Sequence, residues 1–247
     1  GKINVEGVTV RIGESDRFAL TDVSFALPEG EILGVVGPSG SGKSTLARIL
    51  VGAQRPDRGI IRIDGANIED WESDLLGQFI GYLPQEASLF SGTIAENISR
   101  FALGEDAATA IVPAAQAAGA HALIQKMPSG YDTMLGPRGE GVSAGQAQRI
   151  ALARALYRSP RLLVLDEPNA HLDSEGDAAL LETLKAARAE GATVIVMTHR
   201  AGILNAVDKL LVLQNGSAVR FGPRDAVLTE LRQEAANQGR VVNMTGR

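Results

Sequence analysis

The sequence predicts an α/β fold built on a mostly parallel sheet. Short apolar segments alternate with helical ones along most of the 247 residues. Two of these segments, 32–36 and 162–165, contain no polar side chain, which is typical of strands buried under helices on both faces of a parallel sheet. The length and the 45% apolar content are enough for one substantial core in one or two lobes.

Strand-like segments dominate the first part of the chain. Residues 2–36 contain short β-rich stretches that are broken at Gly13 and at 28–30, where turn-forming residues interrupt the pattern. A later strand-like stretch stops at Pro84, because proline cannot donate to a sheet. The elements expected before Pro84 are a helix over 43–51, a β segment over 60–63 turned by Asp64 and Gly65, and a strand over 79–83.

An alanine-rich stretch and a second alternating series follow. Residues 93–126 favour helix, are interrupted by Pro113 and Gly119, and are expected to form a compact lobe. We expect a core of about 1–84 and 160–247 with a helical subdomain of about 86–158. The later elements expected are a helix over 144–158, a strand over 162–165, a helix over 174–189, a strand over 194–197, a hairpin from Lys209 turned at Asn215 and Gly216, and a helix from Arg224.

Composition excludes several classes of function. The net charge of −5 and the 4% aromatic content provide neither the basic surface nor the stacking side chains of a nucleic-acid binder. The absence of cysteine excludes disulfides, thiolate metal sites and a cysteine nucleophile. No apolar run approaches the length of a membrane span, so the domain is expected to be soluble. The start at Gly1 suggests an excised domain whose preceding part is missing.

A phosphate-binding loop is predicted at residues 37–44, Gly-Pro-Ser-Gly-Ser-Gly-Lys-Ser, between an expected strand and an expected helix. Glycines let successive backbone N–H groups turn toward phosphate oxygens, and the helix N-terminus adds partial positive charge. Lys43 is expected to reach the β- and γ-phosphates, and Ser44 to bind Mg²⁺. The nucleotide-binding residues expected here are Gly37, Pro38, Ser39, Gly40, Ser41, Gly42, Lys43, Ser44 and Thr45.

Two adjacent carboxylates, Asp166 and Glu167, end the apolar strand 162–165. An open α/β sheet places its ligands at the carboxyl ends of its strands. Adjacent residues on a strand point to opposite faces, so the two acids can have different roles. We expect Asp166 to bind Mg²⁺ and Glu167 to polarise the attacking water as a general base. The alternative is a solvated acidic strand end.

Further segments complete a recognisable order. Residues 142–146, Val-Ser-Ala-Gly-Gln, precede a strongly helical segment, while Gln85 and His199 each follow a strand. Together with the phosphate loop and the acidic strand end, this order resembles the nucleotide-binding domain of ABC ATPases over essentially all 247 residues. The resemblance implies a P-loop NTPase fold of the ABC ATPase type, with a mostly parallel core sheet, an N-terminal antiparallel β subdomain and a helical subdomain. It also implies ATP and Mg²⁺ as ligands.

The resemblance assigns a role across a dimer to the segment 142–146. Ser143, Ala144, Gly145 and Gln146 would form the signature that caps the γ-phosphate bound by a partner copy, giving two composite sites per head-to-tail dimer. Asp173 would lie in the loop that crosses the dimer interface. Taken without the resemblance, Ser143 is equally well explained as a helix N-cap, and Asp173 would be interpreted as the N-cap of the helix over 174–189.

The resemblance also completes the catalytic set, which would consist of Lys43, Gln85, Glu167 and His199. Gln85 would contact Mg²⁺ or water and link the site to a membrane domain, joining Ser44 and Asp166 as a metal ligand. His199 would contact the γ-phosphate and hold the water. Without the resemblance, a loop amide and a structural histidine are the simpler interpretations of Gln85 and His199.

Two positions depart from the family pattern. The position that would carry the aromatic side chain that stacks on adenine is Ile12, and Phe18 lies six residues further on. We therefore expect adenine to rest on aliphatic surface at Ile12, with looser or less base-selective binding. Ala144 stands where the signature has glycine; its methyl group is tolerated at negative φ but costs about 1 kcal/mol or more at positive φ.

Finer similarities indicate a branch of the family. Residues 89–98 and 131–139 resemble segments of exporter-type proteins, and 37–39, 64–66 with Trp71, 81–85 and 221–224 resemble bacterial type I secretion ATPases. That resemblance implies a membrane domain fused upstream, a homodimer at the cytoplasmic face of the inner membrane, and export of polypeptides with a membrane-fusion protein and an outer-membrane channel. The cargo itself is not encoded in recognisable residues.

Two other classes remain as alternatives. The same residues would serve a soluble ABC ATPase that acts on nucleic acid, ribosomes or iron–sulfur cluster assembly without a membrane. The acidic composition and the exporter-like segments disfavour that class. An inactive binding module would need a broken catalytic set, whereas here the lysine, amide, acid and histidine positions are all filled.

Overall fold

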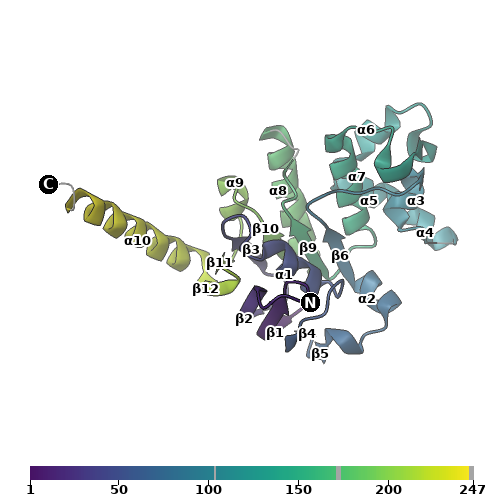
Figure 1. Cartoon of the computed structure of the whole chain (residues 1–247). Coiled ribbons are helices and arrows are strands. Elements are labelled where there is room, and N and C mark those ends of the chain that lie inside the picture. Colours follow the sequence, from purple (N-terminus) through teal and green to yellow (C-terminus); the bar gives the residue numbers. More distant parts are fainter. Residues whose placement is uncertain (103, 171–173, 245–247) are drawn as a thin grey trace.

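A computed structural model describes residues 1–102, 104–170 and 174–244. Its centre is a sheet whose described strands run in the order β12-β11-β3-β10-β9-β6 (Figure 1). Neighbours pair in parallel except β11 and β12, which form an antiparallel hairpin. The strands are β3 (Ile32–Val36), β6 (Ile80–Leu83), β9 (Leu162–Asp166), β10 (Thr193–Met197), β11 (Lys209–Gln214) and β12 (Ser217–Pro223). The mostly parallel core sheet expected from the sequence is confirmed.

A second, antiparallel sheet is formed by the N-terminal part of the chain. Its described strands run in the order β2-β1-β4-β5, and their bounds are β1 (Ile3–Arg11), β2 (Phe18–Leu27), β4 (Arg58–Ile63) and β5 (Ala66–Asn67). Alternate residues of β1, including Ile3, Val8 and Val10, are buried, as in a sheet with one face in the core. They share one apolar cluster with Leu46 of helix α1 (Lys43–Leu50) and with strands of the central sheet.

The helical lobe lies to one side of the central sheet (Figure 1). It contains α3 (Ile94–Ser99), α4 (Glu105–Thr109), α5 (Ile111–Ala117), α6 (His121–Gln125) and the longer α7 (Ala144–Leu156), with a small ladder of β7 (Gly92–Thr93) and β8 (Met134–Leu135). Helix α7 packs against α3 and α5 and also against β6 of the central sheet. It is therefore the element that joins the lobe to the core.

The remaining helices are attached to the core. They are α2 (Ser73–Phe79), α8 (Ser174–Ala189), α9 (Ala201–Leu204) and α10 (Arg224–Met244). Helix α10 extends away from the body of the molecule and leads to the C-terminus (Figure 1). Among the described residues, no helix is both long and apolar enough to cross a membrane.

The elements differ from the expected ones at a few boundaries. Pro113 does not break the lobe but lies in the first turn of α5, where a missing N–H costs nothing. Phe79 ends α2, a helix that the sequence patterns did not indicate, and does not begin β6. Helix α7 ends at Leu156, two residues early, because Arg158 and Ser159 adopt left-handed backbone with φ of 62° and 46°.

Candidate nucleotide site

The loop between β3 and α1 has a backbone that requires glycine. Gly40 and Gly42 have φ of 76° and 101°, in the left-handed region that L side chains rarely adopt. A Cβ at Gly37 would overlap the backbone carbonyl of Leu213 on β11. Gly42 is also the N-cap of α1 and supplies no capping side chain, so no cap side chain covers the first N–H groups of that helix. These groups form a concave donor surface suited to an anion.

The amine of Lys43 lies over this loop. Its Nζ donates to the carbonyl oxygens of Gly37 at 2.8 Å and Pro38 at 3.0 Å. The hydroxyl of Ser41, on the same loop, is buried and has no hydrogen-bond partner. A buried hydroxyl without a partner is costly, and a phosphate oxygen is one acceptor that would satisfy it.

Asp166, the last residue of β9, is more deeply buried than Glu167, with 1% of its surface exposed. Its Oδ1 has no hydrogen-bond partner. Burial raises the pKa of this carboxyl group above its usual range, while a hydrogen bond from Ser44 acts in the opposite direction. A buried carboxylate oxygen without a partner is a site where a cation would relieve the cost of desolvation.

Ser44, Gln85 and Glu167 form a chain of long polar contacts beside Asp166. The Ser44 hydroxyl lies 3.5 Å from Oε1 of Gln85, and the amide nitrogen of Gln85 lies 3.5 Å from a carboxylate oxygen of Glu167. Glu167 has a left-handed backbone with φ of 49°, which is uncommon for a residue with a long side chain. Its amide donates to the carbonyl of Met197 at 3.0 Å, which ties the turn to β10.

These groups fit a divalent cation. A hydroxyl from Ser44, an amide oxygen from Gln85 and a carboxylate from Asp166 are oxygen donors of the kind that Mg²⁺ prefers, and the unpartnered Oδ1 of Asp166 is the observation that supports the fit. Within the described residues, no group of three or more His, Cys, Asp and Glu side chains forms a protein-only metal cage. Mg²⁺ usually binds through one or two protein ligands together with substrate phosphates, so this finding is consistent with the prediction.

A cavity of about 540 Å³ brings together Ile12, most of the phosphate loop, Gln85 and Glu167. The residues that line it are Ile12, Arg17, Phe18, Ala19, Ser39, Gly40, Gly42, Lys43, Ser44, Thr45, Gln85, Glu167, Asn215 and Gly216. Ile12 and Phe18 belong to the β1–β2 hairpin and are 47% and 44% exposed. Ile12 therefore lies on the wall of the cavity that contains the phosphate loop, and the aromatic ring of Phe18 lies on the same wall.

Among the lining residues, Arg17, Ala19, Asn215 and Gly216 were not singled out from the sequence as site residues. Arg17 belongs to the same hairpin as Ile12, and Asn215 and Gly216 form the β11–β12 turn. The amide of Gly216 donates to the carbonyl of Ser41 at 3.2 Å, which brings the turn against the phosphate loop. The sequence indicated the Asn-Gly turn but gave no signal that it folds over the loop.

The predicted signature lies elsewhere, at the N-terminus of α7. Ser143 is the N-cap: its hydroxyl accepts from the amide of Gln146 at 3.3 Å, and the Gln146 side chain accepts from the amide of Ser143 at 2.9 Å. This capping box confirms the N-cap interpretation, which does not conflict with a ligand role. Ala144 is the first residue of α7 and has no positive φ, so its methyl group causes no strain. Gly145 follows it in the first turn.

Among the described residues, Gly37, Pro38, Ser41, Asp166 and His199 were also predicted for the site but do not line this cavity. His199 follows β10, the strand paired with β9, but it is exposed and does not line the cavity. Asp173 lies outside the described residues. The structure of the single chain therefore contains the phosphate loop, Gln85 and Glu167 in one cavity, with the signature on a different lobe.

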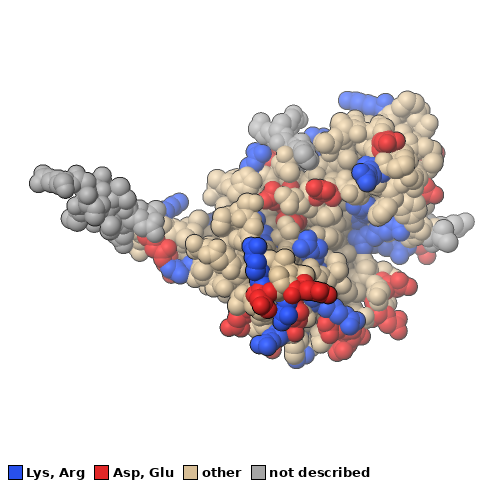
Figure 2. Space-filling model, viewed as in Figure 1, with Lys and Arg blue, Asp and Glu red and all other residues tan. Residues whose placement is uncertain are grey.

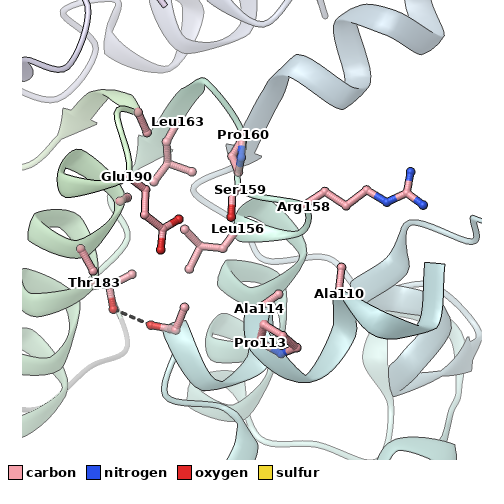
Figure 3. Close-up of a pocket in the computed structure, with 14 residues that line it drawn as sticks. Ala110, Pro113, Ala114, Leu156, Arg158, Ser159, Pro160, Leu163, Thr183 and Glu190 are labelled. Carbon is pink, nitrogen blue, oxygen red and sulfur yellow. Dashed lines mark hydrogen bonds between the residues drawn. The ribbon is translucent and has the colours of Figure 1, made fainter. Parts of the chain in front are cut away.

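A smaller cavity of about 150 Å³ lies between α5, α8 and the end of α7 (Figure 3). Its wall is mostly alanine and proline, and none of the predicted site residues lines it. The hydroxyl of Thr183 on α8 donates to the carbonyl of Ala117 on α5 at 2.7 Å beside it. We interpret this cavity as a packing gap between helices, because its described lining contains no cluster of side chains suited to catalysis or metal binding.

Comparison with known proteins agrees with this geometry. The family model described as ABC transporter matches residues 20–170, a segment that contains the phosphate loop, Gln85, the signature and Asp166. The chain belongs to the ABC transporter family. Its fold and motif order are those of the ATP-hydrolysing domain of exporter-type members, as the sequence patterns predicted.

Individual relatives of this ABC transporter domain include secretion proteins. It is 48% identical to the type I secretion system ATP-binding protein PrsD of Rhizobium meliloti, over 93% of this chain and 39% of that protein. It is 39% identical to the cyclolysin secretion/processing ATP-binding protein CyaB of Bordetella pertussis, over 92% of this chain and 32% of that protein. The chain thus spans well under half the length of these relatives.

A solved structure supports the same placement. The structure of a bacterial Atm1-family ABC exporter with ATP bound matches with a TM-score of 0.84 and 32% identity, over 96% of this chain and 41% of that chain. The similarity extends across the core, the antiparallel sheet and the helical lobe, because nearly the whole chain is covered. The ABC ATPase fold predicted from the sequence is confirmed.

Proposed function

We propose that this domain is the ATP-driven motor of a polypeptide exporter of the type I secretion kind, and that it works as a head-to-tail dimer at the cytoplasmic face of a bacterial inner membrane. The observation that carries the dimer is the separation of parts within one chain. Lys43, Gln85 and Glu167 line one cavity, whereas Ser143 lies at the start of α7 on the helical lobe. A second copy would supply its signature to the open side of that cavity.

The chemistry proposed is hydrolysis of the bond between the β- and γ-phosphates. The amine of Lys43 and the loop N–H groups bind the phosphate oxygens and offset the charge that develops on them. Glu167 accepts a proton from a water whose oxygen attacks the γ-phosphorus, and the bond to the leaving ADP oxygen breaks. Ser44, Gln85 and Asp166 would hold Mg²⁺, which would supply positive charge to offset the charge of the phosphates.

His199 and the signature complete the proposed site. His199, beside the acidic strand end, would contact the γ-phosphate and help to hold the water. The partner copy's signature residues 143–146 would cap the same phosphate, and Asp173 would contact the partner across the interface. In this scheme ATP binding closes the dimer, and hydrolysis with product release reopens it.

The first experiment uses Glu167→Gln. In MgATP this variant is expected to bind nucleotide, to hydrolyse it far more slowly, and to elute as a dimer of twice the 25.9 kDa chain mass by size-exclusion chromatography with light scattering. Lys43→Ala in the same background is the control and should lose nucleotide binding and dimerisation. Undiminished turnover by Glu167→Gln would refute the general-base role.

The secretion role is tested on the native full-length product. We expect a protein much heavier than 25.9 kDa that needs detergent for extraction, because a fused membrane domain would precede this one. Its deletion should remove one or more polypeptides from the culture medium, and co-purification should yield a membrane-fusion protein and an outer-membrane channel. A soluble product of about this mass, or loss of lipid transport with normal polypeptide secretion, would overturn the type I assignment.

A further inference from the structure

Arg100 joins the helical lobe to the core through backbone carbonyls alone. It follows α3, and its guanidinium donates to the carbonyl of Ile80 at the start of β6 at 3.1 Å and to that of Gly77 on α2. The same group donates to the carbonyls of Arg154 and Ala155 in the last turn of α7, at 3.1 Å and 3.3 Å. One side chain thus holds three separate elements.

We call the contact region between the end of α7, β6 and α2 the seam. The backbone around Arg100 directs its side chain into this seam. Arg100 and Phe101 both have φ of 58°, so two consecutive non-glycine residues are in the left-handed region. The amide of Phe101 donates to the carbonyl of Glu96 at 2.8 Å and closes the end of α3. Backbone strain of this kind persists only where the surrounding structure stabilises it. The four hydrogen bonds from Arg100 to backbone carbonyls stabilise the left-handed conformation here.

The charge of Arg100 is not neutralised. Burial lowers the pKa of its guanidinium, and the nearby positive charge of Arg154 lowers it further. Among the described residues, neither arginine forms an ion pair with a carboxylate, and Nη1 of Arg154 has no hydrogen-bond partner. Arginine and lysine side chains gather in the hollow between the helical lobe and α2 (Figure 2).

Arg100 is half-buried, and a partly desolvated guanidinium without a carboxylate partner is costly, because an apolar side chain of similar volume would avoid the desolvation. Its position at the C-terminal end of α7 offsets part of that cost, since the last carbonyls of a helix carry partial negative charge. The feature that an apolar side chain could not reproduce is directional bonding to carbonyls of α2, β6 and α7 at once. This points to a geometric role rather than a purely stabilising one.

Gly81 provides an independent sign that the seam is tight. A Cβ at this position on β6 would overlap the backbone carbonyl of Ala155 on α7 and would lie 2.8 Å from Pro160. Gly81 has no left-handed backbone, so the requirement for glycine is one of space alone. The two backbones therefore touch where Arg100 binds both of them.

Each element in this seam leads to a different half of the nucleotide site. Strand β6 ends at Leu83, two residues before Gln85, and α7 begins just after Ser143. We propose that Arg100 and Gly81 make the crossing of α7 and β6 a fixed joint, which sets the signature relative to Gln85, so that Arg100 is a positioning residue for ATP hydrolysis. This inference rests on the proposed function.

The expected kinetic result separates positioning from general stability. Arg100→Gln should lower kcat by about tenfold or more, because small misplacements of catalytic groups are costly, and should weaken ATP-dependent dimerisation. ATP affinity of the monomer should stay within about twofold, because Lys43 and the phosphate loop lie in the core away from the seam. Arg100→Lys keeps one charged donor and should lose less activity. Arg158→Gln, which changes an exposed arginine just beyond α7, is the matched control and should behave as the parent.

The geometric result is measured directly by spin labelling, which the cysteine-free sequence makes straightforward. Spin labels attached at Gln116→Cys on α5 and at Glu69→Cys on the surface of the core subdomain report the distance between the helical lobe and that subdomain. Both positions are exposed. Arg100→Gln should broaden or shift that distance distribution in the nucleotide-free protein, and Arg158→Gln should not. If Arg100→Gln does not fold, Arg100→Lys and Gly81→Ala carry the same test.

The outcomes are distinguishable. If the parental protein neither hydrolyses ATP nor dimerises with it, the proposed function is wrong. The distance distribution of the spin labels then still tests whether Arg100 fixes the lobe relative to the core. A parental protein that does both, with Arg100→Gln and Gly81→Ala matching it in kcat and in distance distribution, would overturn the inference. An equal loss of kcat and of monomer ATP affinity in Arg100→Gln would also overturn it.

Discussion

At the scale of single residues, Asp166 and Glu167 show how neighbouring carboxylates acquire different chemistry. Asp166 ends β9 with 1% of its surface exposed, while Glu167 is partly exposed, turns away on left-handed backbone and lines the nucleotide cavity. Burial raises the pKa of Asp166, and a cation beside its unpartnered Oδ1 would favour the ionised form. The position of Glu167 on the cavity wall is the one that the proposed general-base role requires.

Asp166 should destabilise the metal-free chain near neutral pH. Its folded pKa is raised, so the folded state binds more protons than the unfolded state, and stability falls as pH rises from the unfolded to the folded pKa. Asp166→Asn removes the buried charge and should raise the Tm of the metal-free protein at pH 7, by roughly 2–4 °C for each kcal/mol gained, while ATP hydrolysis is lost. A Tm that is unchanged at pH 7, with a normal Tm gain from Mg²⁺, would contradict this account.

Ile12 should limit recognition of the base. Ile12→Tyr would present an aromatic face on the cavity wall and should tighten ATP binding about 2- to 10-fold, since aromatic stacking contributes roughly 0.5–1.5 kcal/mol. Competition titrations with several nucleoside triphosphates would measure affinity and base selectivity together. Phe18→Leu is the control for the ring that already lines the cavity. A parent protein that already binds ATP alone tightly would contradict the expectation of weak base selectivity.

At the scale of elements, the segment before α3 is held by a single buried side chain. Asn97, fully buried, donates to the carbonyls of Phe90 and Thr93 and accepts from the amide of Phe90 at 2.8 Å. The side-chain amide of Asn97 thus pairs with both the N–H and the C=O of Phe90, as a neighbouring strand would, and holds the conformation of the segment between β6 and α3. This segment begins near Gln85, so order there extends to the site.

Asn97→Leu keeps the approximate shape of the side chain but removes all three hydrogen bonds. It leaves part-buried backbone groups of Phe90 unpaired, and because a buried unsatisfied group costs about 1–3 kcal/mol, urea denaturation should show a loss of about 1 kcal/mol or more. Thr109→Val, which removes one exposed hydroxyl contact on α4, is the comparison. A free energy of unfolding for Asn97→Leu equal to that of Thr109→Val would disprove the bridging role.

Elements with a strong local signal were predicted well from the sequence, and contacts between distant segments were not. The phosphate loop was recognisable because its glycines and Lys43 are contiguous, and the acidic end of β9 because strand and carboxylates are adjacent. Helix α2 gave only a weak signal because it has seven residues, one of them Gly77, although Leu76 and Phe79 pack against the core. The approach of the Asn215–Gly216 turn to Ser41 and of Arg100 to α7 arises from tertiary packing, which no local pattern encodes.

At the scale of the whole molecule, charge opposes self-association. Each copy carries a net charge of −5, so two copies repel at distances beyond their specific contacts, and bound ATP adds further negative charge. Salt screens this repulsion, with a Debye length of about 8 Å at physiological ionic strength. The proposed dimer should therefore form faster when salt is added from a low level.

This is measurable with Glu167→Gln and MgATP by stopped-flow light scattering. The association rate is expected to rise several-fold between about 20 and 150 mM NaCl, because the long-range repulsion is screened. Replacing two exposed acids far from the cavity, Glu69→Gln and Asp70→Asn, should reduce the salt dependence. A rate that falls steadily with salt would indicate that opposite charges at the interface dominate.

The left-handed backbone of Glu167 places the stability of the domain in conflict with its proposed catalytic activity. A residue held in a sparsely populated conformation lowers the stability of the whole domain, and glycine or asparagine would adopt that conformation more readily. A laboratory selection for heat resistance alone would favour such replacements at position 167 and would discard the carboxylate. Such a domain would be more thermally stable but would no longer hydrolyse ATP. Position 167 should therefore be kept as glutamate when this protein is engineered for thermal stability.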